Sequence, residues 1–403
     1  MAEGSPDRLP GAGRAARLQR AAVARLDRLV PARRAAVGVA PGRAVCVGEH
    51  TDYTGGLALT FAIDRFIAVA LAPAASGYTL AGADDLAVVR AAALVPRRRP
   101  GELWANLPLG VLAELARAGH EVPPCALQVT ADLPRNAGLS SSAALTAATL
   151  VAALRWTGGS LDTAQAAELC WRAEHDFAQV PCGVMDQLTV IGGLPGRALL
   201  LDCARATRTP VALRTPHARW FAVDSGVRHD IGGIGYRTRR AEWEQVRGRL
   251  SQLRLDPRQL RPRDLVAVSQ GWPPPLPDRI SHVVSENRRV AAAVRAARSG
   301  RVRAMGRLLN RTQASLRDRY QVGDPTTDRL AAALAELEGV LGARVIGGGF
   351  GGTVLVLAED RASRRDGARL RAAAARVLGR AAPVVRLRPG AGAAWMAPDV
   401  VST

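Results

Sequence analysis

The chain has no lysine, and all 55 of its basic residues are arginines. A Walker A phosphate loop and a protein kinase each need a lysine beside the nucleotide phosphates, so the sequence excludes both classes. A lysine Schiff base is excluded for the same reason. Phosphate chemistry in this chain must therefore depend on arginines, hydroxyl groups and backbone amides.

Cysteine is also scarce. The five cysteines are scattered and form no Cys-x-x-Cys pair, which argues against a zinc site. We interpret them as reduced thiols and expect a cytoplasmic protein. Their positions are Cys46, Cys125, Cys170, Cys182 and Cys203.

Long apolar runs are missing as well. The longest run worth testing, residues 143–154, is too short to span a bilayer. The N-terminus has arginines throughout and lacks the apolar segment of a signal peptide. We therefore expect no membrane partner.

Aromatic residues make up only 4% of the chain, although its formal net charge is +20. A nucleic-acid-binding protein more often combines a basic stripe with aromatic residues or a known binding module, and none stands out. Arginine and alanine occur throughout the sequence, which is typical of the compositional bias of a GC-rich genome. We expect no nucleic-acid partner.

What the chain has is enough apolar sequence for a substantial core. Its 403 residues are 48% hydrophobic, which favours two domains because single cores rarely grow past about 250–300 residues. Strand signals dominate the first half and predict a mixed sheet with helices on it. Helical patterns follow residue 235, with further strands near the C-terminus. We predict an α/β (α+β) fold with domains at residues 15–210 and 211–403.

The first unusual segment is VGEHTDYTGG, residues 47–56. A surface turn accounts for its Thr-Gly-Gly end but leaves the cluster of Glu49, His50 and Asp52 unexplained. The second segment is DLPRNAGLSSSAAL, residues 132–145, in which a strand ends and three serines open a long helix. A helix start offers free backbone N–H groups and the positive end of the helix dipole, which favours a phosphate site. A simple N-cap serine is the alternative.

Two later segments are ambiguous when taken alone. VIGGGFGGTVLVL, residues 345–357, contains a glycine string of the dinucleotide-binding kind, but no helix follows, so a tight hairpin is favoured. Asp186 follows the helix break Pro-Cys-Gly at residues 181–183. It is either a positioned functional carboxylate or a helix cap.

Together, PGRAVCVGEHTDYTGG, PRNAGLSSSAAL, CGVMDQ, GYRTRR and GGGFGGTVLVL resemble the galactokinases, a branch of the GHMP family of small-molecule kinases. The resemblance covers residues 40–357. It implies the two-domain GHMP kinase fold with the active site in the cleft, and transfer of the ATP γ-phosphoryl group to the C1 hydroxyl of a galactose-like sugar. We expect ATP and Mg²⁺ as ligands and a monomeric protein.

The resemblance also implies a role for each site residue. Asp186 would act at the anomeric hydroxyl, as catalytic base or as a fixed charge, with Arg43 beside it stabilising the transferred group. The sugar-binding residues would be Glu49, His50, Asp52, Gly183, Asp186 and Tyr236. Because carboxylates and a histidine pair with hydroxyl groups, such a set suits a polyol.

The nucleotide would meet a second set of residues. Its phosphates would lie on Gly138, Leu139, Ser140, Ser141 and Ser142, with the loop that contains Gly348 and Gly349 closing over them. Ser142 and Glu174 would approach Mg²⁺, a hard cation that prefers oxygen ligands. Trp104 is assigned either to the adenine ring or to the core.

The chain departs from the family pattern at three places. Val45 stands where the family usually has asparagine, Arg135-Asn136 where it usually has Leu-Gly, and Gly235 where glutamate commonly precedes the tyrosine. Two alternatives therefore remain beside a galactokinase. One is a kinase of another sugar or of a cyclitol, and the other is a sugar- and ATP-sensing regulator without catalysis.

Overall fold

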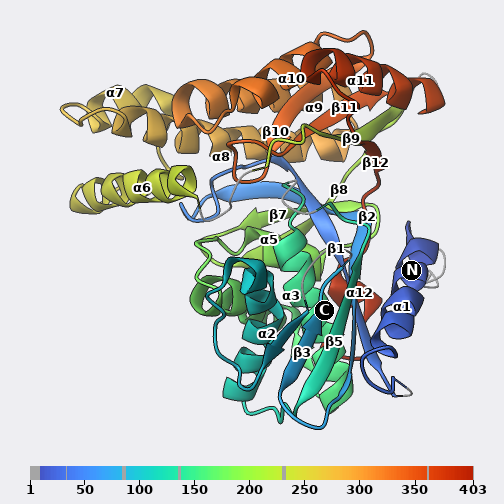
Figure 1. Cartoon of the computed structure of the whole chain (residues 1–403). Helices are drawn as coiled ribbons and strands as arrows, with labels where there is room; N and C mark the ends of the chain where they lie inside the picture. The colour runs from blue at the N-terminus through green and yellow to red at the C-terminus, as the bar shows by residue number, and fades with distance from the viewer. Residues whose placement is uncertain are drawn as a thin grey trace.

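The computed structural model describes residues 10–32, 34–83, 88–134, 138–228, 233–360 and 363–402. Two α/β bodies lie one above the other, the N-terminal body below and most of the C-terminal half above (Figure 1). The predicted α/β (α+β) fold with a mixed N-terminal sheet is confirmed.

The N-terminal domain is built on a seven-stranded mixed sheet in the order β4-β3-β5-β2-β7-β8, with β1 also paired to β2. All neighbours run antiparallel except β3 and β5. The strands are β1 (Ala36–Val47), β2 (Leu57–Pro73), β3 (Tyr78–Ala81), β4 (Val89–Ala91), β5 (Cys125–Ala131), β7 (Arg197–Asp202) and β8 (Thr207–Ala212).

Helix α3 lies in the core of this domain. Every residue from Ala143 to Leu154 is buried, because the helix is apolar all round and packs on β1 and β2. Gly38 allows the close approach, since a Cβ there would lie 2.0 Å from the carbonyl oxygen of Ala148. The helical elements of this domain are α1 (Ala12–Leu26), η2 (Pro100–Ala105), α2 (Asn106–Arg117), α3 (Ser141–Thr157), α4 (Thr163–Arg172), the π-helical turn η3 (Ala173–Phe177) and α5 (Met185–Gly192).

The C-terminal domain has a four-stranded antiparallel sheet in the order β10-β11-β9-β12. Helices α10 and α11 pack on the sheet, while α6, α8 and the π-helical turn η5 share a separate apolar cluster. Its elements are β9 (Ala218–Asp224), α6 (Ile234–Gln252), η4 (Pro262–Asp264), α7 (Leu265–Val268), α8 (Leu276–Ser299), α9 (Val302–Ser315), η5 (Leu316–Tyr320), α10 (Pro325–Ala335), β10 (Val340–Ile346), β11 (Thr353–Glu359), α11 (Ser363–Leu378) and β12 (Val384–Leu387).

The C-terminal tail returns to the N-terminal domain. After β12 it forms α12 (Ala393–Met396), which packs on α5 and β1, and β13 (Val401–Ser402), which pairs in parallel with β6 (Leu161–Asp162). A bidentate ion pair between Arg155 and Asp399 fastens it further. The C-terminus therefore lies among N-terminal elements (Figure 1). The boundary at residue 211 stays a prediction, although the chain does leave the first sheet after β8 and enter the second at β9.

Within the described ranges, no helix combines the length and hydropathy that a bilayer crossing requires. The apolar segment 143–154 is instead the buried middle of α3.

Candidate active site

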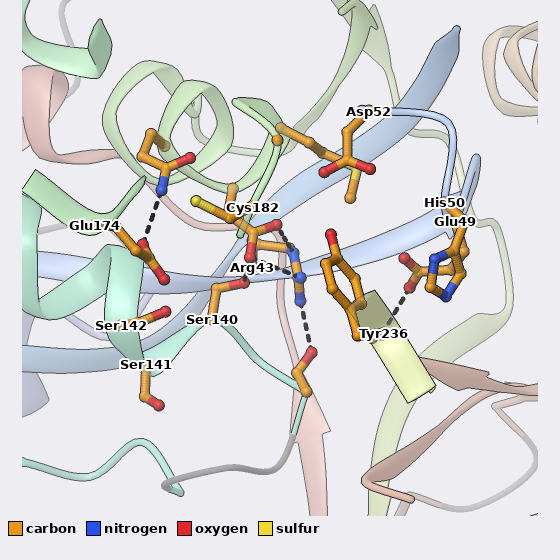
Figure 2. Close-up of a pocket in the computed structure, with 17 residues that line it drawn as sticks. Arg43, Glu49, His50, Asp52, Ser140, Ser141, Ser142, Glu174, Cys182 and Tyr236 are labelled. Atoms are coloured by element: carbon orange, nitrogen blue, oxygen red, sulfur yellow. Dashed lines mark hydrogen bonds and ion pairs between the residues drawn. The ribbon is translucent and has the colours of Figure 1, made fainter. Parts of the chain in front are cut away.

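A cavity between the two domains gathers most of the predicted site residues. Its walls come from β1, the loop after β1, the start of α3, the start of α5, the first turn of α6 and the loop after β10. Figure 2 shows Arg43 in the middle, with the serines on one side and Tyr236, Glu49 and His50 on the other. The lining residues are Arg43, Glu49, His50, Asp52, Gly138, Ser140, Ser141, Ser142, Glu174, Cys182, Gly183, Met185, Asp186, Gln187, Tyr236, Gly347 and Gly348.

Arg43 and Asp186 form a bidentate ion pair at the centre of the cavity. The Nε of Arg43 lies 2.7 Å from Oδ1 of Asp186, and its Nη2 lies 2.9 Å from Oδ2. The third nitrogen, Nη1, donates to the carbonyl of Gly138 at 2.5 Å. Burial alone would lower the pKa of Arg43, but the carboxylates of Asp186 and Glu49 outweigh it and raise the pKa. The guanidinium is therefore fixed in place and stays charged.

The serine loop does more than begin a helix. Ser140 occupies the N-cap position of α3 with φ of 59°, yet its hydroxyl makes no capping hydrogen bond and instead donates to Asp186. The first turn of α3 itself carries no acidic residue, and Ser141 and Ser142 line the cavity at the positive end of the helix dipole. The simple N-cap interpretation does not describe Ser140, and the geometry suits an anion.

Glu174 lies beside Ser142 on the π-helical turn η3. Burial raises the pKa of its carboxyl to about 7, although hydrogen bonds from Ser142 and Gln187 oppose the rise. The amide of Gln187 donates to Glu174 at 2.8 Å. Among the residues that the structure describes, no cluster of three or more His, Cys, Asp or Glu side chains could hold a metal ion. One carboxylate and one hydroxyl do fit Mg²⁺, which usually takes one or two carboxylates and completes its shell with phosphates and water.

The opposite wall carries the polar groups of the VGEHTDYTGG segment. Burial, followed by the charge of Asp186, raises the pKa of Asp52 to about 6. Gly183 is packed against this carboxylate so closely that a Cβ would lie 2.2 Å from Oδ2 of Asp52. Tyr236 projects into the same space from the first turn of α6 (Figure 2).

His50 is held by a chain of tyrosines. Its Nδ1 lies 2.9 Å from the hydroxyl of Tyr53, which in turn lies 2.9 Å from the hydroxyl of Tyr320. Burial lowers the pKa of His50 well below its usual value, so the ring is neutral. The buried Nε2 has no hydrogen-bond partner in the described part of the protein. A buried polar atom without a partner at a cavity wall is free to pair with a ligand.

Three predicted site residues do not line this cavity. Leu139 is buried in the core, where its carbonyl accepts a hydrogen bond from the backbone of Arg43. Gly349 lies against Val322, and Trp104 packs partly buried between two apolar clusters. Their predicted contacts with the nucleotide stay predictions.

Sequence reasoning also missed lining residues. Cys182, Met185 and Gln187 flank the predicted Gly183 and Asp186, so their closeness in the sequence was the available signal. Gln187 is fully buried and holds Glu174, a role that no local pattern announces.

The departures from the family pattern have structural counterparts. Val45 is fully buried in the apolar core. Gly235 faces the ring of Phe350, and a Cβ there would lie only 2.7 Å from the ring's Cζ. Arg135 and Asn136 lie outside the described residues.

The chain matches known protein families and curated relatives. The chain matches the GHMP kinases N terminal domain over residues 106–193, the galactokinase galactose-binding signature over residues 30–73, and the GHMP kinases C terminal domain over residues 293–376. It is 37% identical to the galactokinase of Bos taurus, covering 81% of this chain and 84% of that protein. It is 34% identical to the galactokinase of Thermotoga maritima, covering 80% and 89%.

Solved structures show the same likeness. The crystal structure of Lactococcus lactis galactokinase complexed with galactose aligns with a TM-score of 0.85 at 26% identity, covering 92% of this chain and 97% of that one. The Methanococcus jannaschii mevalonate kinase, at 14% identity and a TM-score of 0.61, shares the fold. The fold is thus that of a GHMP kinase. Within that class, the chain belongs to the galactokinase family.

Proposed function

We propose that this protein is an ATP-dependent galactokinase, which transfers the γ-phosphoryl group of ATP to the C1 hydroxyl of galactose. The observation that carries the proposal is the Arg43–Asp186 pair, which lies between an anion site at the start of α3 and a wall of hydroxyl-binding groups. Membership of the galactokinase family and the galactose-binding signature over residues 30–73 support the choice of sugar.

Asp186 and Arg43 would have different roles at the reacting atoms, Asp186 at the sugar hydroxyl and Arg43 at the phosphoryl group. Asp186 accepts a hydrogen bond from the C1 hydroxyl and, as base or as fixed charge, orients its oxygen for in-line attack. Arg43 fixes the position of that carboxylate through two hydrogen bonds and stabilises charge on the phosphoryl group during transfer. The two residues are already paired, so the protein does not have to rearrange them when substrates bind.

The side of the cavity formed by Glu49, His50, Asp52 and Tyr236, here called the polar wall, would select the sugar. Asp52 and Glu49 offer carboxylate oxygens to hydroxyl donors, while His50 and Tyr236 add further polar contacts. A sugar that lacks a matching hydroxyl leaves one of these buried groups unpaired, which is costly. Specificity for the sugar would therefore come from hydrogen bonds between its hydroxyl groups and buried polar side chains.

On the nucleotide side, the amides and hydroxyls of residues 138–142 would bind the phosphates. Ser142 and Glu174 would hold Mg²⁺, which when bound neutralises phosphate charge. The side chain of Gln187 orients Glu174 for this purpose. A monomeric state and a cytoplasmic location belong to the same proposal, and the five free cysteines support the location.

The test is ADP release by purified protein with Mg-ATP and a panel of hexoses, amino sugars and cyclitols. We expect galactose to give the highest kcat/KM. A higher kcat/KM for another sugar or a cyclitol would contradict galactose as the substrate but would still support kinase activity. Saturable binding of sugar and ATP without turnover would contradict the proposed enzymatic activity and favour a sensor.

A further inference from the structure

Glu49 is the most constrained carboxylate of the polar wall. Its Oε1 accepts the backbone N–H of Gly347 at 2.7 Å and lies 2.8 Å from Nη2 of Arg344. Within the described residues, no group donates to Oε2. One oxygen is thus committed to the protein while the residue lines the cavity.

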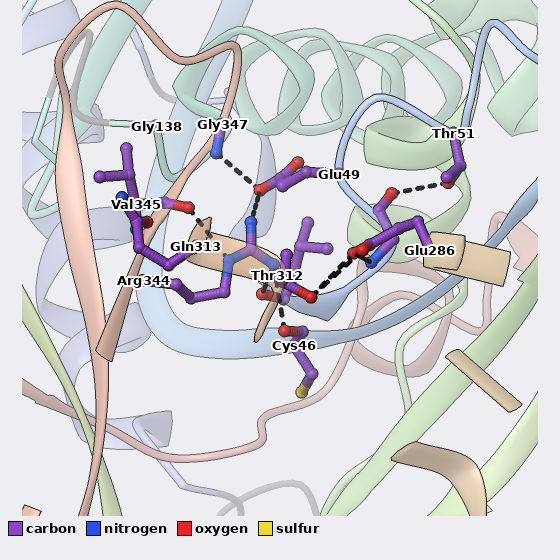
Figure 3. A network of polar contacts seen from close by, with 12 residues as sticks. Cys46, Glu49, Thr51, Gly138, Glu286, Thr312, Gln313, Arg344, Val345 and Gly347 are labelled. Atoms are coloured by element: carbon purple, nitrogen blue, oxygen red, sulfur yellow. Dashed lines mark hydrogen bonds and ion pairs between the residues drawn. The ribbon is translucent and has the colours of Figure 1, made fainter. Parts of the chain in front are cut away.

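Arg344 lies on β10 and is fully buried. Its Nη1 donates to the carbonyls of Cys46 at 3.0 Å and Val45 at 3.2 Å, and its Nε donates to the carbonyl of Val345 at 3.0 Å. Figure 3 shows the guanidinium reaching Glu49 on one side and Cys46 on the other. Three carbonyls therefore fix its plane, and Glu49 supplies the only carboxylate paired with it in the described structure.

The backbone around Glu49 is also held by side chains of the C-terminal domain, which contains Arg344. Glu286 on α8 accepts the N–H of Gly48 at 2.8 Å, and Thr312 on α9 donates to the same carboxylate. The Nε2 of His282 lies 3.2 Å from the carbonyl of Glu49. A segment that belongs to the N-terminal domain is thus oriented by side chains of the C-terminal domain.

We propose that Arg344 is a positioning residue for sugar binding, which holds Oε1 of Glu49 and leaves Oε2 as an acceptor for a sugar hydroxyl. This inference rests on the proposed function. Burial raises the pKa of Glu49, and Arg344 is the largest influence that opposes the rise. Without Arg344 the carboxyl would take up a proton more readily and lose its fixed orientation.

The first test is Arg344→Lys, which keeps the charge but loses the planar fork. We expect the KM for the sugar to rise about 10- to 100-fold, the range typical of losing a charge-assisted hydrogen bond, while the KM for ATP stays within about twofold. The acid limb of kcat/KM for the sugar should also move to higher pH, because Glu49 is protonated sooner. Equal changes in both KM values, or an unmoved acid limb, would show a merely structural cross-link and overturn the proposal.

The matched control is Arg279→Lys. Arg279 is also a buried arginine of the C-terminal domain, and it pairs with Glu242 at 2.6 Å. We expect this variant to lose stability but to keep the sugar KM within about twofold. A sugar KM that rises as much as in Arg344→Lys would show that general loosening of the domain causes the effect, and would count against the proposal.

A double variant covers the case in which Arg344→Lys fails to fold. Glu49→Gln combined with Arg344→Gln removes both charges, so neither remains buried and unpaired. If Arg344 acts through Glu49, the double variant binds sugar as weakly as Glu49→Gln alone. A further tenfold loss would refute the inference. Failure of the proposed function is distinguishable, because wild-type protein would then turn over none of the panel.

Discussion

The guanidinium of Arg43 donates two hydrogen bonds to the carboxylate of Asp186, with nitrogen–oxygen distances of 2.7 and 2.9 Å. The two residues are 143 positions apart, yet β1 and the start of α5 bring them together in the middle of the cavity. Ser140 donates a third hydrogen bond to the same carboxylate. This arrangement links the phosphate side of the site directly to the sugar side.

Replacing Asp186 tests that link. Asp186→Ala should lower kcat by about 10²- to 10⁴-fold, the usual contribution of a positioned proton acceptor. The variant should still fold, but with lower stability, because it leaves the buried Arg43 without its carboxylate partner. ADP release measures the rate, and circular dichroism checks the fold. A folded variant with a near-normal rate would refute the assigned role.

Gly183→Ala should weaken sugar binding. The new Cβ would lie 2.2 Å from Oδ2 and 2.5 Å from Cγ of Asp52, so the carboxylate has to move. We expect the sugar KM to rise about tenfold or more while the ATP KM is unchanged, because a displaced hydrogen-bond partner costs about 1.4 kcal/mol or more. Gly248→Ala on α6 is the control, since nothing lies within 4 Å of its Cβ. An unaltered sugar KM in Gly183→Ala would contradict the prediction.

Glu174 should give the ligand-free protein a distinctive pH dependence. Its pKa is about 7, above the usual 4.5, mainly because burial disfavours the charge. The stabilisation from the protonated form is therefore complete below about pH 4.5 and is lost as the pH rises through 7. Relative to Glu174→Gln, the wild type should lose up to about 3 kcal/mol of unfolding free energy between pH 4.5 and 8.

Urea unfolding of both proteins across this pH range is the measurement. Only their difference is informative, because burial lowers the pKa of His282 to about 4, and this residue contributes with the opposite sign. Parallel pH curves for the two proteins would show that Glu174 is not perturbed.

Gly235→Glu restores the residue that the family commonly has before the tyrosine. The Cβ would lie 2.7 to 2.9 Å from three ring atoms of Phe350, so the ring and its glycine loop must shift. We expect a loss of about 1 kcal/mol in stability, as is typical of mild overpacking, and a several-fold higher sugar KM because Tyr236 is adjacent. Adding Phe350→Ala should restore the KM. No change in melting temperature or KM would mean that the ring has room to yield.

The motif residues of the site could be predicted because each motif is a contiguous stretch of unusual composition. Glu49, His50 and Asp52 lie within four positions, and the three serines are consecutive. The serine loop predicted either an anion site or a cap. The structure decides this for Ser140 through a hydrogen bond to Asp186 that no local pattern contains.

Arg344 and Glu286 could not be predicted in the same way. Each is a single polar residue in an ordinary strand or helix pattern, and a chain with 55 basic residues offers many similar arginines. What distinguishes Arg344 is its complete burial against carbonyls of β1, which depends on how the two domains meet.

The returning tail has a practical consequence for anyone who divides this protein. A fragment ending near residue 211 would lack β13, the partner of β6, and would lose Asp399 as the partner of Arg155. A separately made C-terminal fragment would carry α12 with its packing surface bare. A fusion tag attached after Ser402 would likewise emerge beside the first domain, so an affinity handle belongs in the loop between α7 and α8.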